Sequence, residues 1–548
     1  MVGEDVKMGA RKVPAVSLAI FLLSVLPKSG PVPYYSGSGT PNDPYLIYTA
    51  TEMNQIGLNF TDWNKNFMLM ADINLDAYTG TQFSRIGTDD RHAFNGVFNG
   101  NGHTISNFTY TAPSSSYVGI FGHTSASARV EKVALVNVNV TGSEFIGGLV
   151  GYNEGTISDS SVAGAISGYS FVGGLTGYNF TGTISNCSST GTVTGGDYSE
   201  YLGGLVGYSN GNIGNCFSTG ATSGRVSSNY LGGLVGQSDG SISNCHSKGT
   251  VAGGDTSNYL GGLAGVNYGI ISNSFSTAAV SGGSSAYCLG GLAGYNYNTV
   301  SACWAGSNVS GGASRRSVGG LVGEIGPPGV VSNCYATGEV SADHDVGGLV
   351  GMNDKGTITK CHSSGKVSGS EYAGGLLGWN NLGTISNSFW DTNSSTQSSS
   401  AGGIGKTTEQ MKTYSTFADA GWDFNDIWSI REGINYPRFI WQILLGDIVC
   451  PGGVDIYDLT ELCDEWLFEK IPADLAPLGG DGIVNFADFA VFADQWGVSQ
   501  DIDTLLDFAE QWLKVGLPSH SADIWPRPNG DGRVNASDLA VLADNWLQ

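Results

Sequence analysis

A short glycine motif recurs nine times along the chain at a nearly constant spacing. It has the form Gly-Gly-Leu-x-Gly, and successive copies begin 26 to 30 residues apart. The copies begin at Gly147, Gly173, Gly203, Gly232, Gly261, Gly290, Gly319, Gly347 and Gly374. A constant period in this range is typical of repeat proteins, in which each unit buries its apolar face against its neighbours. The motif therefore predicts a stack of similar coils.

Each unit consists of short pieces typical of strands and turns. In residues 171–195, pieces rich in β-forming residues alternate with Gly, Asn and Ser. Such pieces are too short and too rich in Gly for helices. The sequence predicts a mainly β fold: a β-solenoid, or parallel β-helix, of about ten coils of 27–30 residues, expected to be right-handed. Propeller blades, the alternative, usually need about 40 residues each. The positions expected to point inward are Leu175, Ile184, Cys187 and Val193.

Two further positions recur in the repeat. One is occupied by Cys187, Cys216, Cys245, Cys303, Cys334 and Cys361, with Ser274 and Ser388 in two other units. Exchange of Cys with Ser favours a small inward filler over a disulfide, and a single file of thiols does not converge on a metal. The other is occupied by Asn186, Asn215, Asn244, Asn273, Asn333 and Asn387, which predicts an amide ladder at a corner.

Changes in composition divide the chain into five segments. We expect a signal peptide and linker (1–34), an N-terminal cap (35–115), the repeat array (116–390), a C-terminal cap (391–446) and a helical module (447–548). Basic residues before the apolar stretch 13–26 indicate an export signal that is too short to span a bilayer comfortably, although a buried helix is the alternative. Within the first cap, a short helix is expected over 51–57 with Thr51 as its cap.

The last hundred residues follow a different pattern. Four segments place apolar residues at i, i+3, i+4 and i+7, each ending in Trp, and this spacing predicts short amphipathic helices. Residues 447–548 hold 19 acidic and 4 basic residues and so carry −15 of the net charge of −24. This excess of acid disfavours nucleic acid as a partner and favours cations.

Two acidic loops precede helices in this module. Residues 529–538 place oxygen-bearing side chains at positions 3, 5, 9 and 12 of a calcium loop, with Gly at position 6, and residues 480–488 repeat the second part. Upstream aspartates could complete each site only if the loop bulges. The candidate Ca²⁺ ligands are Asp474, Asp481, Asn485, Asp488, Asp523, Asn529, Asp531, Asn535 and Asp538. An acidic helix bundle with solvated carboxylates is the alternative.

Both parts of the chain resemble known families. The loop-helix segments resemble the dockerin type I module, which implies Ca²⁺ binding and docking to a cohesin-like partner, although Pro477 and Arg527 stand at position 1 of the two loops. The glycine motifs resemble the GLUG-motif repeats of bacterial adhesin-like surface proteins. That resemblance implies an extracellular β-solenoid and supplies no catalytic residues.

Together these features predict a secreted or cell-surface protein that is not an enzyme and has no membrane span. We expect the solenoid to bind a glycan or cell surface, and the tail to bind Ca²⁺ and a cohesin-like or cell-surface protein. The alternative is a polysaccharide lyase or glycoside hydrolase, which needs clustered carboxylates. The densest group, Asp343, His344 and Asp345, is expected in a variable inter-strand loop, and acids are not expected to converge from adjacent coils. His246 and His362 are expected on the solvent face.

Overall fold

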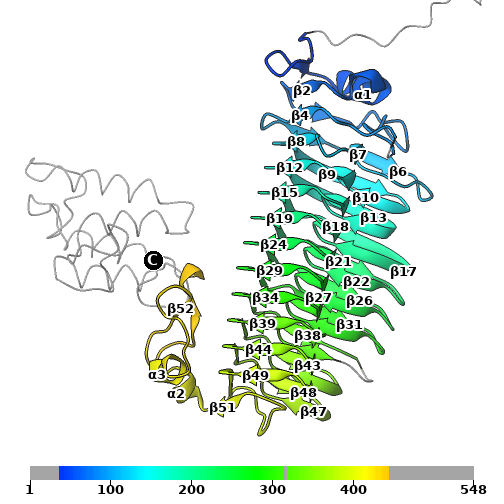
Figure 1. The fold of residues 1–548 in the computed structure, drawn as a ribbon. Coiled ribbons are helices and arrows are strands. Elements are labelled where there is room, and N and C mark those ends of the chain that lie inside the picture. Colours follow the sequence, from blue (N-terminus) through cyan, green and yellow to red (C-terminus); the bar gives the residue numbers. More distant parts are fainter. Residues whose placement is uncertain (1–35, 90, 313–316, 443–548) are drawn as a thin grey trace, which may run out of the picture. The chain divides into compact units, whose positions relative to one another are not determined.

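The computed structural model describes residues 36–442, except residue 90 and residues 313–316 (Figure 1). The chain divides into two compact units, Met1–Lys406 and Thr407–Gln548. The expected signal segment (1–34) and the expected calcium-binding helical module (447–548) lie outside the described residues. Within the described part, no helix is both long and apolar enough to cross a membrane.

The first unit is a β-solenoid of about 11 turns. Its named strands pair in parallel and form sheets of 13, 28 and 10 strands. A single coil runs through β14 (Thr176–Asn179), β15 (Thr183–Ser185), β16 (Ser188–Ser189) and β17 (Thr192–Gly203). Strand β14 lies in the 10-stranded sheet, β15 in the 13-stranded sheet and the other two in the 28-stranded sheet. The predicted parallel β-solenoid is confirmed.

The strands of the two smaller sheets follow one another coil by coil (Figure 1). The 13-stranded sheet contains β1 (Tyr45–Ile47), β2 (Asn66–Leu69), β4 (Val97–Asn99), β8 (Arg129–Glu131), β12 (Thr156–Ser158), β15, β19 (Asn212–Gly214), β24 (Ser241–Ser243), β29 (Ile270–Ser272), β34 (Thr299–Ser301), β39 (Val330–Ser332), β44 (Thr357–Thr359) and β49 (Thr384–Ser386). The 10-stranded sheet contains β7 (Phe121–Thr124), β11 (Val150–Asn153), β14, β18 (Val206–Ser209), β23 (Val235–Ser238), β28 (Ala264–Asn267), β33 (Ala293–Asn296), β38 (Val322–Ile325), β43 (Val350–Asp354) and β48 (Leu377–Asn381).

One set of strands in the large sheet leads into the glycine motif. These strands are β10 (Glu144–Gly147), β13 (Ser161–Gly173), β17, β22 (Asn229–Gly232), β27 (Asn258–Gly261), β32 (Tyr287–Gly290), β37 (Val318–Gly319), β42 (His344–Gly347) and β47 (Glu371–Gly374). The chain then turns into the 10-stranded sheet, and the Leu of each motif is buried, as Leu175 and Leu205 show. The first motif glycine provides room for a close approach of backbone, because a Cβ on Gly203 would overlap the carbonyl oxygen of Val206.

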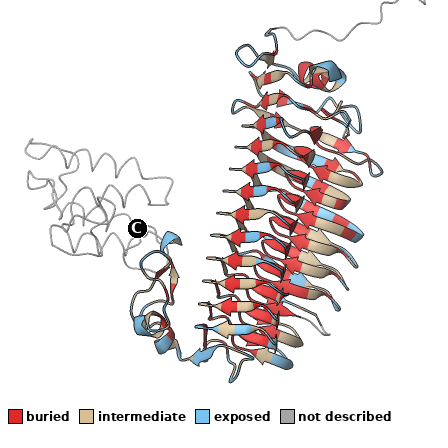
Figure 2. Ribbon diagram, in the orientation of Figure 1, coloured by how far each residue is buried: buried red, intermediate tan, exposed pale blue. Residues whose placement is uncertain are grey.

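The interior of the coils is a continuous apolar core (Figure 2). The predicted inward positions Leu175, Ile184, Cys187 and Val193 are all at most 1% exposed. The Cys/Ser position is confirmed as a buried filler with free thiols in the described part of the chain. Cys and Ser can replace each other because both accept the same hydrogen bond from the backbone of the preceding coil. Cys216 Sγ accepts from the Cys187 N–H at 3.3 Å, and the Ser274 hydroxyl oxygen accepts from the Cys245 N–H at 3.1 Å.

The corner asparagines adopt the left-handed conformation that the turn requires. Their φ angles lie between 46° and 54°, a region that Asn tolerates better than most residues. Asn215 donates its side-chain N–H to the amide oxygen of Asn186 at 3.3 Å, as the ladder prediction requires. A second ladder, buried and not predicted, includes Asn153, whose Nδ2 donates to Asn179 Oδ1 at 2.7 Å.

The described chain has a short helix near its start, unlike the coils that follow it. At the start, helix α1 (Ala50–Leu58) is capped by Thr49 through a capping box with Glu52, so the expected cap at Thr51 is two residues too late. The Thr49 hydroxyl and Glu52 carboxylate satisfy backbone N–H groups that Thr51, inside the helix, could not reach.

The described part of the second unit has its own small core. It contains α2 (Thr408–Met411), α3 (Tyr414–Ala418), β52 (Trp428–Ser429) and β53 (Arg438–Phe439). Trp428 packs against Trp422 and Phe439 with ring centroids 4.4 and 4.7 Å apart. Aromatic residues of the segment expected as the C-terminal cap (391–446) therefore pack against one another.

Candidate functional site

A ladder of aromatic rings runs along the solenoid where the large sheet turns into the glycine motif. Each ring except the first, which lies one coil before the nine motifs, stands two residues before the first motif glycine. The rings are Tyr117, Phe145, Phe171, Tyr201, Tyr230 and Tyr259. Each residue has a φ between 54° and 63°. Because this backbone conformation recurs at one register, the side chains leave successive coils in the same direction.

Close stacking covers the faces of the inner rings. Tyr201 and Tyr230 have centroids 4.6 Å apart and planes 5° apart, and Tyr230 and Tyr259 are 5.3 Å and 9° apart. No ligand fits between rings at this spacing, so this ladder mainly stabilises the stack of coils. Burial is the main cause that raises the pKa of Tyr201 and Tyr259 to about 12, with smaller contributions from Tyr230 and Cys288, respectively.

The ladder is interrupted near its C-terminal end. The strand register places Cys288, Ser317 and Asp345 on three successive coils where rings stand elsewhere. A ring returns at Tyr372 on the following coil. Small and acidic side chains thus replace three rings, and they leave space that the ladder fills in the preceding coils.

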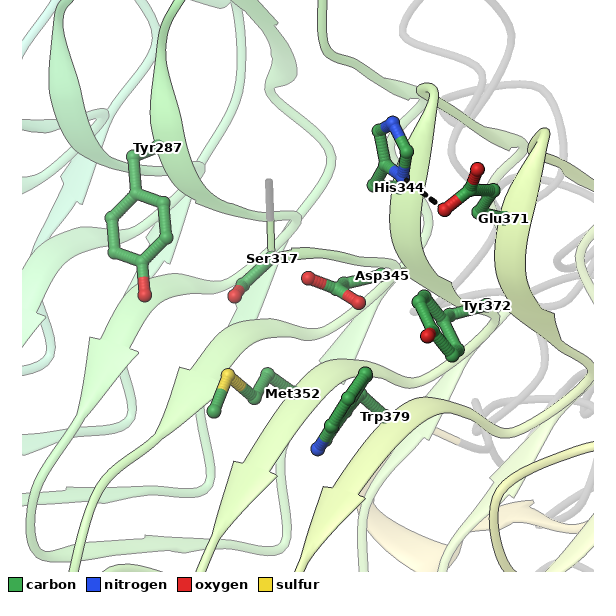
Figure 3. Close-up of a pocket in the computed structure, with 8 residues that line it drawn as sticks. All are labelled: Tyr287, Ser317, His344, Asp345, Met352, Glu371, Tyr372 and Trp379. Carbon is green, nitrogen blue, oxygen red and sulfur yellow. Dashed lines mark ion pairs between the residues drawn. The ribbon is translucent and has the colours of Figure 1, made fainter. Parts of the chain in front are cut away.

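A pocket of about 340 Å³ lies at this interruption (Figure 3). It is lined by Tyr287, Ser317, His344, Asp345, Met352, Glu371, Tyr372 and Trp379. These residues come from β32, β42, β43, β47 and β48 and from the residue before β37. The pocket is therefore assembled from four successive coils, and a single repeat does not contain it.

One wall of the pocket is organised by a carboxylate. Glu324 Oε2, on β38, accepts hydrogen bonds from the Tyr287 hydroxyl, from Cys288 Sγ at 3.3 Å and from Ser317 Oγ at 3.3 Å. Burial, and then the nearby Glu324 carboxylate, raises the pKa of the Cys288 thiol well above its usual value. Burial is also the largest cause of the raised pKa of Tyr287. Both groups therefore stay protonated at neutral pH and act as donors to Glu324.

The opposite wall combines an ion pair with two rings (Figure 3). His344 Nδ1 lies 3.3 Å from Glu371 Oε2, across the pairing of β42 with β47. Tyr372 and Trp379 meet edge to face, with centroids 4.5 Å apart and planes at 65°. Tyr372 is 54% exposed and Trp379 38% exposed. Since these rings are not stacked on each other, their surface is available to a ligand.

The structure corrects the sequence-based view of the acidic residues. His344 and Asp345 lie on strand β42 and line the pocket; they are not in an inter-strand loop. Asp345 and Glu371 come from adjacent coils and line the same pocket, contrary to the expectation that acids from adjacent coils would not converge. In the sequence, the pocket is indicated by the position two residues before Gly-Gly-Leu, where Cys288, Ser317 and Asp345 replace the aromatic residues of other coils.

The two histidines expected on the solvent face are held within a second column of rings. His246 lies between Phe217 and Phe275, with centroids 5.1 and 4.8 Å away. His362 is completely buried and stacks on Tyr335 at 4.9 Å. Both histidines occupy a strand position at which the neighbouring coils have aromatic residues. This shared position, rather than the polarity of histidine, explains why they stack in the column.

The candidate calcium ligands, Asp474 to Asp538, lie outside the described residues, so their arrangement stays a prediction. Among the residues that are described, no group of three or more His, Cys, Asp and Glu side chains is arranged to hold a metal ion.

The GLUG motif family model matches residues 168–194, 227–252, 314–341 and 342–368. The chain carries GLUG repeats. The last two matches contain the pocket residues Ser317, His344 and Asp345 together with Glu324. Four of the eight lining residues of the pocket therefore lie in matched repeats.

Two relatives share part of the sequence. Halomucin of Haloquadratum walsbyi is 35% identical over 138 residues, which are 24% of this chain and 2% of halomucin. A protein of Evansella cellulosilytica named as a Gly-rich membrane protein is 35% identical over 135 residues, which are 24% of this chain and 15% of that protein. The similarity covers a small part of either relative.

Among solved structures, a Bacteroides ovatus chain described as an immunoglobulin A1 protease is similar over 74% of this chain and 95% of its own length. The sequence identity is 20% and the TM-score 0.28. A similarity of this degree carries no inference about activity.

Proposed function

We propose that this protein is a secreted or surface-displayed, non-catalytic β-solenoid that binds a glycan at the pocket where the aromatic ladder is interrupted. The pocket itself is the observation that carries the proposal. It combines the exposed rings of Tyr372 and Trp379 with the carboxylates of Asp345 and Glu371. Ligand sites generally pair apolar walls with a few polar groups that orient the ligand.

This combination suits a carbohydrate. The C–H groups on one side of a pyranose ring pack on aromatic surface, while its hydroxyls donate to carboxylates, which are acceptors when ionised. The stacked rings of the intact ladder lack this capacity because their faces contact one another. The surface relatives, halomucin and the Gly-rich membrane protein, agree with an extracellular location.

The C-terminal segment supplies the second part of the proposal. Its calcium-loop pattern supports Ca²⁺ binding by the ligands from Asp474 to Asp538, and the resemblance to dockerin supports docking to a cohesin-like or cell-surface protein. The solenoid would then present the glycan-binding pocket, and the tail would tether the protein.

A panel of oligosaccharides titrated into the full chain by calorimetry tests the glycan site. Replacing Trp379 with Ala is expected to weaken binding at least about tenfold, since it removes an aromatic wall. The control is Tyr297→Ala, which removes a 42% exposed ring outside the pocket and should leave affinity unchanged. Equal effects of the two variants, or no binding to any oligosaccharide, would contradict the proposal.

The clustered carboxylates favour a second candidate, cleavage of a polysaccharide. Glycoside hydrolysis uses two carboxyl groups, one as acid and one as base or nucleophile, and Glu324, Asp345 and Glu371 come from successive coils. The same oligosaccharides incubated with the protein distinguish the two functions. Binding without release of new reducing or unsaturated ends supports the non-catalytic function, whereas turnover abolished by Asp345→Asn supports the enzyme.

A further inference from the structure

Glu324 occupies a position that other coils fill without an acidic side chain. The register of the 10-stranded sheet aligns it with Tyr152, Tyr178, Tyr208, Gln237, Val266, Tyr295, Met352 and Trp379. Because Val266 and Met352 fill this position on other coils, the stacking of the coils does not require a carboxylate there. The acidic side chain belongs to the part of the array in which the aromatic ladder is interrupted.

Three donors converge on this carboxylate. The Tyr287 hydroxyl, the Cys288 thiol and the Ser317 hydroxyl all donate to Glu324 Oε2. An ionised carboxylate only accepts hydrogen bonds, and it holds a donor about twice as strongly as a neutral acceptor does. Cys288 and Ser317 stand at the register of the ladder rings, so Glu324 connects the small side chains that replace two of those rings.

Two of these donors form part of the pocket wall. Tyr287 and Ser317 line the pocket, whereas Glu324 is not among its described lining residues. Both lie on the side of the pocket away from the ion pair of His344 and Glu371 (Figure 3). Glu324 therefore stands behind this wall and contacts the side chains that form it.

The Tyr287 ring is not held by parallel stacking. It meets Tyr259, the last ring of the intact ladder, with centroids 6.4 Å apart and planes at 82°. Successive rings of the ladder, such as Tyr230 and Tyr259, are instead nearly parallel. The hydrogen bond to Glu324 is thus the contact that fixes the hydroxyl end of Tyr287 and, with it, the direction in which the ring faces the pocket.

We infer that Glu324 is a positioning residue of the pocket, which holds Tyr287 and Ser317 in the arrangement that binds the glycan and does not contact the glycan itself. The inference rests on the proposed glycan-binding function. Removal of the carboxylate then weakens binding by releasing Tyr287, so the effects of changing Glu324 and Tyr287 are not additive.

A double-mutant cycle on the full chain tests the inference. Tetramers of glucose, N-acetylglucosamine and galacturonic acid are titrated by calorimetry into the unsubstituted protein, Glu324→Gln, Tyr287→Phe and the double variant. For a tetramer that binds, each single change is expected to weaken binding at least about fivefold, as the loss of a hydrogen bond to a charged group does. The double variant should bind no more weakly than the weaker single variant, because both changes break the same hydrogen bond.

A second variant and a matched control accompany the cycle. Glu324→Met introduces the side chain that Met352 already places at this register on the next coil, so it should fold and should weaken binding as Glu324→Gln does. The control is an equivalent pair outside the pocket, in which the Tyr208 hydroxyl donates to Asp239 Oδ2 at 2.7 Å. Asp239→Asn and Tyr208→Phe should leave the affinity unchanged.

The outcomes separate the positioning role from the proposed function. If a tetramer binds and both Glu324 variants bind it as tightly as the unsubstituted protein, the positioning role is wrong and the glycan-binding function stands. If Glu324→Gln weakens binding by the same factor with and without Tyr287→Phe, Glu324 acts independently of Tyr287 and the inference is wrong. Equal weakening by Asp239→Asn also overturns it, because the effect would not be specific to the pocket. If neither these tetramers nor any other oligosaccharide binds, both proposals are wrong.

Discussion

At the scale of single residues, the first motif position requires glycine because the neighbouring backbone leaves no space for a side chain. The first glycine of each motif is placed where the chain leaves the large sheet, and its φ is not in the left-handed region at Gly203. A side chain there would overlap the Val206 carbonyl, and backbone cannot move aside as a flexible side chain can. The corner asparagines and the ladder aromatics are among the residues that do adopt a left-handed φ.

Gly203→Ala is therefore expected to lower the free energy of unfolding by at least about 2 kcal/mol, as overpacking against backbone does. The measurement is a denaturant titration of the full chain. Gly196→Ala is the matched control on the same strand, β17, because a Cβ there would meet nothing within 4 Å. A similar loss in both variants would show that the close approach of the Val206 carbonyl is not what makes glycine necessary at position 203.

At the scale of structural elements, the solenoid is stabilised by columns that run across the coils. The Cys/Ser column, the buried Asn column and the aromatic ladder each connect one coil to the next through contacts at a single register. Such contacts act only between neighbours, as in other repeat proteins. An interruption of one column can therefore create a pocket while the other columns preserve the stack.

The tyrosine ladder gives this stability a dependence on alkaline pH. Tyr201 and Tyr259 have pKa values of about 12 in the folded chain, against about 10 in an unfolded chain. Their contribution is fully present below pH 10 and is lost as the pH rises through 12, because the unfolded chain loses these protons first. Ultraviolet titration of tyrosinate should show these groups ionising later in the native chain than in the denatured chain. Coincident curves would contradict the burial of the ladder.

At the scale of the whole molecule, the charge is unevenly distributed between the repeat array and the tail. Residues 447–548 carry −15 of the −24 charges, whereas residues 116–390 hold 14 acidic and 9 basic residues. The described solenoid contains no group arranged for a metal, so calcium is expected to act on the tail and to leave the coils unaffected.

Removal of Ca²⁺ with a chelator is expected to destabilise residues 474–548 and to leave the solenoid transition unchanged, because a bound ion stabilises only the part that binds it. Calorimetric unfolding of the full chain, with and without chelator, measures both transitions. Asp531→Ala should reproduce the effect of the chelator, and Asp544→Ala, outside the predicted loops, is the control. An unchanged tail transition after chelation would show that the loops do not bind calcium.

The sequence by itself determined the coil, because the signals for a coil are local. The period of the glycine motif, the inward Leu175 and Ile184, the Cys/Ser filler and the corner Asn186 all follow from short-range patterns that recur along the array. The cap of helix α1 was predicted two residues late, since both Thr49 and Thr51 can cap and only the contact with Glu52 decides between them.

Only the tertiary structure decided the pocket. The coils differ in length by a few residues, so the sequence alone does not show which side chains share a register across coils. Pairing of β32, β37, β42 and β47 places Tyr287, Asp345 and Glu371 around one space, although 84 residues separate the first from the last. The chemistry of this site arises from contacts between coils. The repeat pattern predicts that neighbouring coils are in contact, but it does not show which residues of one coil lie beside which residues of the next.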